Sequence, residues 1–141
     1  MFMKKALSVV LVLTVAVLSV PLMSFQPVFA ADWASALEYE INGTETAVEI
    51  TDCDALASGV LTIPAIIEEL PVISVGSYAF SDCTLLTSII IPDSIMSIGD
   101  SAFSGCTSLT SVTIPNSIIN IGKRAFSGCT SLTGITIPNS V

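Results

Sequence analysis

The segment "IPDSIMSIGDSAFSGCTSLTSVT", residues 91–113, is followed directly by "IPNSIINIGKRAFSGCTSLTGIT", residues 114–136. The two share a pattern that returns every 23 residues, and a third copy begins with "IPNSV" at Ile137. Residues 75–90, "VGSYAFSDCTLLTSII", form the tail of an earlier copy. Repetition at this period indicates a solenoid, in which each unit buries its apolar side against its neighbours. We therefore predict a repeat solenoid that is mostly β, with short helical turns.

Within one copy, the alternation of apolar and polar residues predicts which side chains face the core. "LTSVTIP", residues 109–115, alternates apolar with hydroxyl side chains, and β-branched residues favour an extended chain. Pro115 cannot donate a ladder hydrogen bond, so we expect the strand to stop there. "KRAFSGC", residues 123–129, is too short for a full helix and is interpreted as a helical turn ended by Gly128. The expected core positions are Leu109, Val112, Ile114, Ile118, Ile121, Ala125, Phe126 and Cys129.

The chain before the repeats divides into two segments. Residues 1–30 contain Lys4 and Lys5, an apolar run and a small-residue site ending at Ala30, which is the anatomy of a secretory signal peptide. A transmembrane anchor is the alternative, although Pro21 interrupts the run. Residues 31–59 lack the repeat and are predicted to be an N-terminal cap. In that cap, a hairpin around Asn42-Gly43 and the side chains of Trp33 and Tyr39 would cover the first coil.

Residues 60–141 are predicted to hold about three repeats, of which the first is atypical and the last is truncated. Pro64 and Gly76 are 12 positions apart, whereas Pro92 and Gly99 are 7 apart, so five extra residues lie within "AIIEELPVISV". We expect a protruding loop there, containing Glu68, Glu69 and Pro71. Because the pattern stops within a copy, we also expect either a longer coding sequence or end-to-end self-association through the open strand edge.

Charge and residue types exclude several function classes. All 12 acidic residues follow Ala31, against two basic ones, Lys123 and Arg124, which gives the segment after the signal a net charge of −10. Such a surface repels nucleic acid and anionic lipid, so neither is an expected partner. The chain has no His, which removes Ser-His and Cys-His nucleophile systems. We predict no enzyme activity, no catalytic residue, no cofactor and no metal ligand.

Three cysteines recur with the repeat, at Cys83, Cys106 and Cys129. Stacked side chains that point the same way are poorly placed for disulfides, and metal-ligand spacings such as C-x₂-C are missing from the sequence. We therefore expect a ladder of buried, reduced thiols. The partner of Cys53, which lies outside the ladder, stays open.

The consensus "IPxSIxxIGxxAFSGCTSLTxxT" resembles the BspA-type leucine-rich repeat, a 23-residue variant of bacterial surface proteins. The resemblance covers residues 60–141; Asp82 and Leu85 depart from the consensus in the first copy. It implies a leucine-rich-repeat-like fold and a secreted or cell-surface protein that binds other proteins, sometimes as an adhesin. Such a resemblance by itself does not fix function.

Two functions are therefore expected to compete. The first is binding of a protein or glycan ligand at the cell surface through outward residues of the strand face. The second is an architectural spacer within a larger extracellular protein, whose active or anchoring domain would lie beyond Val141. The candidate ligand-binding residues of the first hypothesis are Ser88, Ile90, Ser111, Thr113, Gly134 and Thr136.

Overall fold

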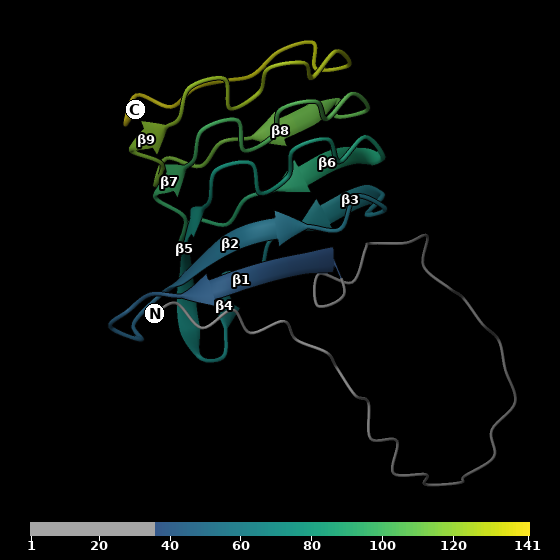
Figure 1. Cartoon of the computed structure of the whole chain (residues 1–141). Helices are drawn as coiled ribbons and strands as arrows, with labels where there is room; N and C mark the ends of the chain where they lie inside the picture. Colours follow the sequence, from purple (N-terminus) through teal and green to yellow (C-terminus); the bar gives the residue numbers. More distant parts are fainter. Residues whose placement is uncertain (1–35) are drawn as a thin grey trace, which may run out of the picture.

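The computed structural model describes residues 36–141 (Figure 1). The predicted signal peptide, residues 1–30, and the cap residue Trp33 lie outside the described residues. Short strands joined by turns make up the described chain. They are β1 (Leu37–Ile41), β2 (Val48–Cys53), β3 (Gly59–Thr62), β4 (Ile66–Ile67), β5 (Leu70–Val75), β6 (Leu86–Ile90), β7 (Ser97–Ile98), β8 (Ser111–Thr113) and β9 (Asn120–Ile121).

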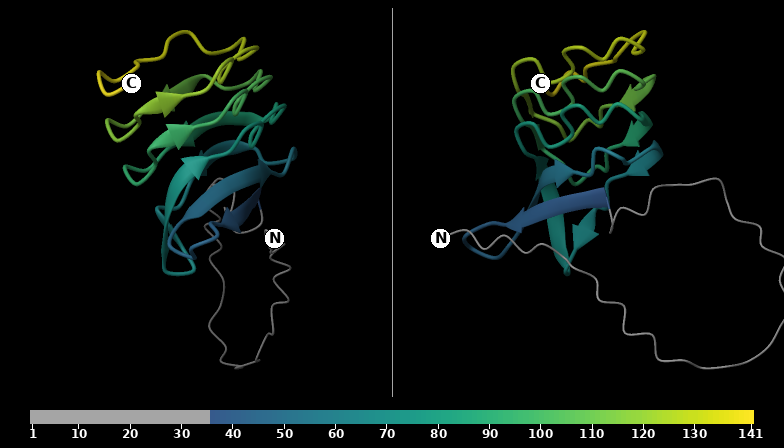
Figure 2. Two further views of the ribbon diagram at one scale, coloured as in Figure 1. Left: turned by 60° about the vertical axis from the view of Figure 1, so that its left-hand side comes forward. Right: turned by 45° about the vertical axis from the view of Figure 1, so that its right-hand side comes forward.

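These strands form two sheets on different sides of a β-solenoid of about three turns (Figure 2). The larger sheet has the order β1-β2-β5-β7-β9, with β4 paired to β5, and the smaller has the order β3-β6-β8. Strands from successive coils pair in parallel, because each coil brings the chain back in the same direction. The solenoid predicted from the repeat period is confirmed.

The register between coils follows the 23-residue period. Ser97 pairs with Asn120, and Ser88 pairs with Ser111. On the turn side, the backbone N–H of Lys123 donates to Asp100 Oδ1 at 2.7 Å. Asp100 therefore lies beside Lys123 as the alignment requires, but it binds the backbone of Lys123 instead of the ammonium group.

The core contains a column of aromatic rings. The rings of Phe80 and Phe103 stack with centroids 5.0 Å apart, and those of Phe103 and Phe126 with centroids 5.2 Å apart. Six of the eight predicted core positions are buried; Ile121 and Phe126 are half-buried. Both lie in the last complete copy of the described residues, where no complete coil packs against them from the C-terminal side.

The segments around each Ala-Phe pair are successions of β-turns, not helical turns. In the second copy, the N–H of Ala102 donates to the carbonyl of Gly99, and the N–H of Ser104 donates to that of Ser101. Ser101 and Gly105 have left-handed φ angles of 54° and 75°. A right-handed helix cannot pass through such residues, so the chain alternates its curvature and advances without forming a helix.

Hydrogen bonds to the next coil offset the strain of these left-handed residues. Every second N–H of the turn points along the solenoid axis and meets a carbonyl of the following copy at 2.8–2.9 Å. The bonds run from Ser101 to Lys123, from Phe103 to Ala125 and from Gly105 to Ser127. The turn side of the stack is therefore held by a backbone ladder of its own.

The cap is a β-hairpin that also serves as the first rung of the larger sheet. β1 pairs antiparallel with β2, and β2 pairs in parallel with β5. The connecting turn is longer than the two residues of an Asn-Gly hairpin, because Asn42 Oδ1 accepts the N–H groups of Thr46 and Ala47. Tyr39 is buried as predicted, and its hydroxyl donates to Glu68 Oε1 at 2.8 Å.

The five extra residues of the first copy form a second hairpin. Glu68 and Glu69 occupy its turn with φ angles of 49° and 65°, and both are exposed, as predicted. Pro71, predicted to lie in a loop, instead lies in β5 opposite Ile66. The prediction of a protruding loop was wrong for Pro71, because apolar residues on both sides of the two glutamates allow the strands to pair.

Candidate functional site

The strand face is built on the smaller sheet, β3-β6-β8. Its central residues, Leu61, Ile89 and Val112, are register partners and point into the core. Side chains alternate along a strand, so the residues on either side of them point outward. The candidate residues were predicted from this alternation in the sequence.

Parallel pairing aligns the outward residues in two rows across the three strands. Ser88 pairs with Ser111, and Ile90 pairs with Thr113. Ile90, Ser111 and Thr113 are exposed and Ser88 is half-buried. Four of the six predicted residues therefore lie together on one surface.

The other two candidates, Gly134 and Thr136, belong to the last coil. Both are exposed, but their segment does not form a strand. It lies in the coil next to β8 (Figure 1). No atom would contact a Cβ built on Gly134, whereas the glycines that bend each coil are crowded. The strand face is regular through β8 and becomes irregular after it.

Two residues that sequence reasoning did not select complete the rows. Val60 pairs with Ser88, and Thr62 pairs with Ile90. The signal was present, because "VLTIP" at residues 60–64 has the same alternation as the later strands. Each row therefore spans three strands.

The chemistry of the strand face is uncharged. Its rows combine hydroxyl groups with two aliphatic side chains, Val60 and Ile90, which are 41% and 49% exposed. Such a surface can exchange hydrogen bonds through Ser and Thr and bury apolar area, but it offers no acid, base or activated nucleophile. Binding is the chemistry that this arrangement supports.

The four cysteines are free thiols, in agreement with the predicted reduced ladder. Cys106 Sγ donates to the carbonyl of Phe80 at 3.0 Å, and Cys129 Sγ donates to that of Phe103 at 3.1 Å. Burial raises the pKa of Cys106 to about 12, so the unreactive thiol form predominates at neutral pH. The cap's Cys53 lies against this ladder, since Cys83 Sγ is 4.0 Å from its carbonyl oxygen.

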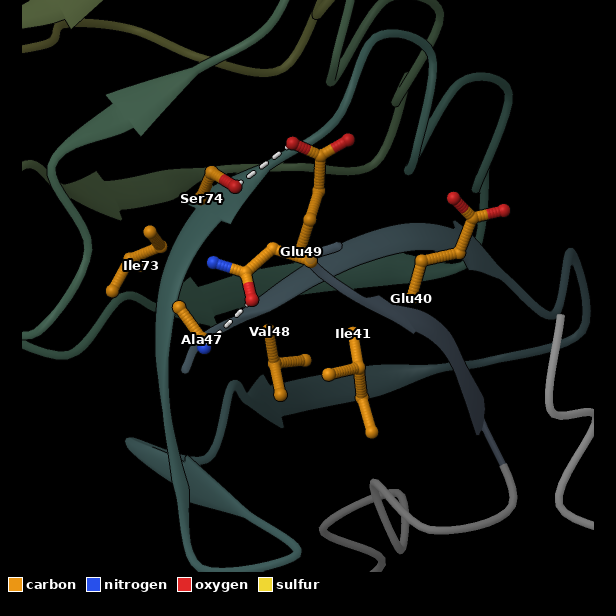
Figure 3. Close-up of a pocket in the computed structure, with 8 residues that line it drawn as sticks. Glu40, Ile41, Ala47, Val48, Glu49, Ile73 and Ser74 are labelled. Carbon is orange, nitrogen blue, oxygen red and sulfur yellow. Dashed lines mark hydrogen bonds between the residues drawn. The ribbon is translucent and has the colours of Figure 1, made fainter. Parts of the chain in front are cut away.

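A pocket of about 220 Å³ lies on the other sheet, between the cap and β5 (Figure 3). Its walls include Glu40, Glu49, Ile73 and Ser74. Ser74 Oγ donates to Glu49 Oε2 at 2.9 Å. Within residues 36–141, no group of His, Cys, Asp or Glu side chains could hold a metal ion. The same residues contain no helix with the length and hydrophobicity that a membrane span requires.

The stacked parallel coils and their 23-residue register define a leucine-rich repeat solenoid, a fold that typically carries no catalytic site. The profile described as "BspA type Leucine rich repeat region (6 copies)" matches residues 61–141, more than half of the chain. The chain belongs to the BspA-type leucine-rich repeat family. A comparison with curated protein sequences gives no match.

Solved structures of bacterial leucine-rich repeat proteins are similar to this chain. The T. pallidum leucine rich repeat protein TpLRR matches with a TM-score of 0.72 and 32% identity over 77% of this chain and 50% of its own. A leucine-rich repeat protein from Bacteroides capillosus matches at 0.68 and 35%, over 75% and 80%. A leucine rich cell surface protein from Faecalibacterium prausnitzii matches at 0.59 and 33%, over 72% and 28%. This chain spans about half the length of TpLRR.

Proposed function

We propose that the chain is a secreted or cell-surface protein that binds protein ligands through the strand face of β3, β6 and β8. The protein-interaction role of such repeat proteins supports the general function. The signal-like composition of residues 1–30 and the F. prausnitzii relative, which is a cell surface protein, support the location.

The observation that carries this proposal is the in-register surface around Ile90. Val60 and Ile90 expose 41% and 49% of their surface within two aligned rows that are otherwise Ser and Thr. Protein interfaces combine an apolar centre with a polar rim, and their centres are depleted in charged residues. The rigid backbone of the paired strands also limits the entropy lost on binding.

A binding screen with matched variants tests the proposal. The chain from residue 31 would be presented to an array of extracellular-matrix and bacterial surface proteins, together with Ile90→Arg and Thr113→Arg. The control is Ser127→Arg, because Ser127 is exposed on the turn side of the stack. We expect to find ligands that bind the native chain and the control but do not bind either strand-face variant.

Two other outcomes would contradict the proposal. A ligand that still binds both strand-face variants but no longer binds Ser127→Arg would place the binding site on the turn side. No binding to any protein of the array would favour the spacer role, in which the solenoid holds another domain and its own faces need no ligand.

A further inference from the structure

The larger sheet presents an apolar column on its outer side. The N–H of Met96 donates to the carbonyl of Ile73 at 2.8 Å, and the N–H of Ile119 donates to that of Met96 at 2.9 Å. These bonds stack the three residues one above another in successive coils. Ile73 is half-buried, whereas Met96 and Ile119 are 43% and 64% exposed. Apolar side chains aligned in this way form a continuous strip, unlike the singly scattered residues found on most surfaces.

A polar row runs directly beside this column. Each member is the register partner of the next, and the row crosses the strands β1, β2, β5, β7 and β9 of the six-stranded sheet. It starts with two carboxylates in the cap and continues with neutral side chains in the repeats. Its members are Glu40, Glu49, Ser74, Ser97 and Asn120.

The column and the row meet at the pocket between the cap and β5 (Figure 3). Ile73 and Ser74 line one wall, and Glu40 and Glu49 project from the neighbouring strands. Glu49 is held by the hydroxyl of Ser74 at 2.9 Å. The surface therefore has an anionic hollow at one end and an apolar strip leading away from it.

No cation of the described chain reaches this hollow. Residues 36–141 contain 11 acidic residues, and their basic residues, Lys123 and Arg124, lie in the last turn segment. Within residues 36–141, the group that donates a side-chain hydrogen bond to Glu49 is the neutral hydroxyl of Ser74. A cationic group of a binding partner would complement the charge of this hollow.

We propose that this outer face of β1, β2, β5, β7 and β9 docks a cationic, amphipathic peptide segment of a partner protein. A Lys or Arg side chain of the segment enters the hollow between Glu40 and Glu49. Apolar side chains of the same segment lie along Ile73, Met96 and Ile119. This surface is separate from the strand face, so it adds a second partner class to the proposed function.

Each half of the surface contributes a different property to such binding. The carboxylates attract a basic segment and accelerate its encounter, an effect that salt weakens because charges are screened beyond about 10 Å at 0.1 M ionic strength. The apolar strip supplies burial that salt does not weaken, and it discriminates against peptides that are only basic. A nucleic acid would be repelled by the same carboxylates.

Designed peptides and fluorescence anisotropy test the proposal. The probe is a labelled peptide of alternating Lys and Leu, with two matched twins: Glu in place of Lys, and Ser in place of Leu. The native chain is expected to bind the probe at least about tenfold more tightly than either twin, which corresponds to about 1.4 kcal/mol. Equal binding of the Ser twin would show attraction by net charge alone and would overturn the proposal.

Variants locate the binding on the chain. The double variant Glu40→Gln, Glu49→Gln should weaken binding about tenfold, whereas Glu69→Gln with Asp54→Asn, which removes the same charge elsewhere, should change it less than about twofold. Ile119→Ser should weaken it about fivefold, and Ile90→Ser, at an equally apolar site on the strand face, should not. If the two double variants weakened peptide binding equally, or if Ile119→Ser and Ile90→Ser did, the assigned surface would be contradicted. The strand-face proposal would be unaffected.

Discussion

The ring of Phe103 stacks on the ring of Phe80 with centroids 5.0 Å apart and planes inclined by 17°. Both side chains are fully buried, one in each of two successive copies. The contact joins residues 23 positions apart and thus depends on the stacking of whole coils. Loss of either ring removes packing from two coils at once.

Replacement of Phe103 by Ala should lower the free energy of unfolding by about 3–5 kcal/mol, because it leaves a cavity inside the aromatic column. Phe126→Ala should cost less, about 1–2 kcal/mol, since Phe126 is half-buried and stacks on one side only. Urea unfolding followed by circular dichroism measures both. Equal losses for the two variants would show that the column is not the stabilising element described here.

Gly99 marks a point of close approach between successive coils. A Cβ at this position would lie 2.5 Å from the backbone nitrogen of Ser77 and 2.6 Å from the carbonyl carbon of Gly76. Gly99→Ala should therefore destabilise the chain by about 1–3 kcal/mol through overpacking. Gly43→Ala is the control, because no atom lies within 4 Å of its Cβ, and it should stay within about 0.5 kcal/mol of the native chain. A neutral Gly99→Ala would contradict the coil spacing.

Ser94 and Ser117 occupy equivalent positions but differ in hydrogen bonding. Ser117 Oγ donates to the carbonyl of Ile95 at 2.7 Å, whereas the buried Ser94 Oγ has no partner in the described structure. The residue equivalent to Ile95 in the preceding copy is Val72. It lies within the extended strand β5, whereas Ile95 follows a turn. Ser117→Ala should cost about 1 kcal/mol and Ser94→Ala should be neutral or stabilising. Thermal unfolding of the two variants measures the difference, and the reverse order would be inconsistent with this assignment.

Tyr39 makes the stability of the cap sensitive to alkaline pH. Burial, with the hydrogen bond to Glu68, raises the pKa of Tyr39 to about 12. The phenol of an unfolded chain has a pKa of about 10. The stabilisation is therefore complete below about pH 10 and is lost as the pH rises through the raised value of about 12.

A spectroscopic titration checks this dependence. Tyr78→Phe leaves Tyr39 as the sole tyrosine, because the chain contains two. Phenolate absorbance should then titrate near the raised pKa of about 12 in the native chain and near about 10 in denaturant. Tyr39→Phe should remove the part of the alkaline stability loss that the ionisation of Tyr39 causes. A native midpoint near that of the denatured chain would refute the buried hydrogen bond.

Sequence periodicity predicted the solenoid and its register, because each coil must bury the same positions. It could not predict the β-turns around the Ala-Phe pairs. Tyr78, Ser101 and Arg124 are left-handed there, with φ angles of 54–62°, although none is Gly. In the first two copies the N–H of that residue bonds to the next coil, and such contacts cannot be seen in the local sequence.

The strand face was predictable in part, and the second surface was not. Alternation along each strand identified Ser88, Ile90, Ser111 and Thr113. In contrast, Ile95-Met96 and Ile118-Ile119 are adjacent apolar pairs, of which only one member can face the core. The structure buries Ile95 and Ile118 and leaves the other two exposed. That choice depends on the bend before β7 and β9, which residue types alone do not determine.

Hydroxyl-radical footprinting of the native chain bound to a ligand from the array tests the strand face most directly. Large exposed side chains report on all three sides of the solenoid: Ile90 on the strand face, Met96 on the outer face of the larger sheet and Tyr78 on the turn side. We predict that the ligand reduces oxidation of Ile90 severalfold and leaves Met96 and Tyr78 unchanged. Protection of Tyr78 or Met96 with Ile90 still fully reactive would contradict binding through β3, β6 and β8.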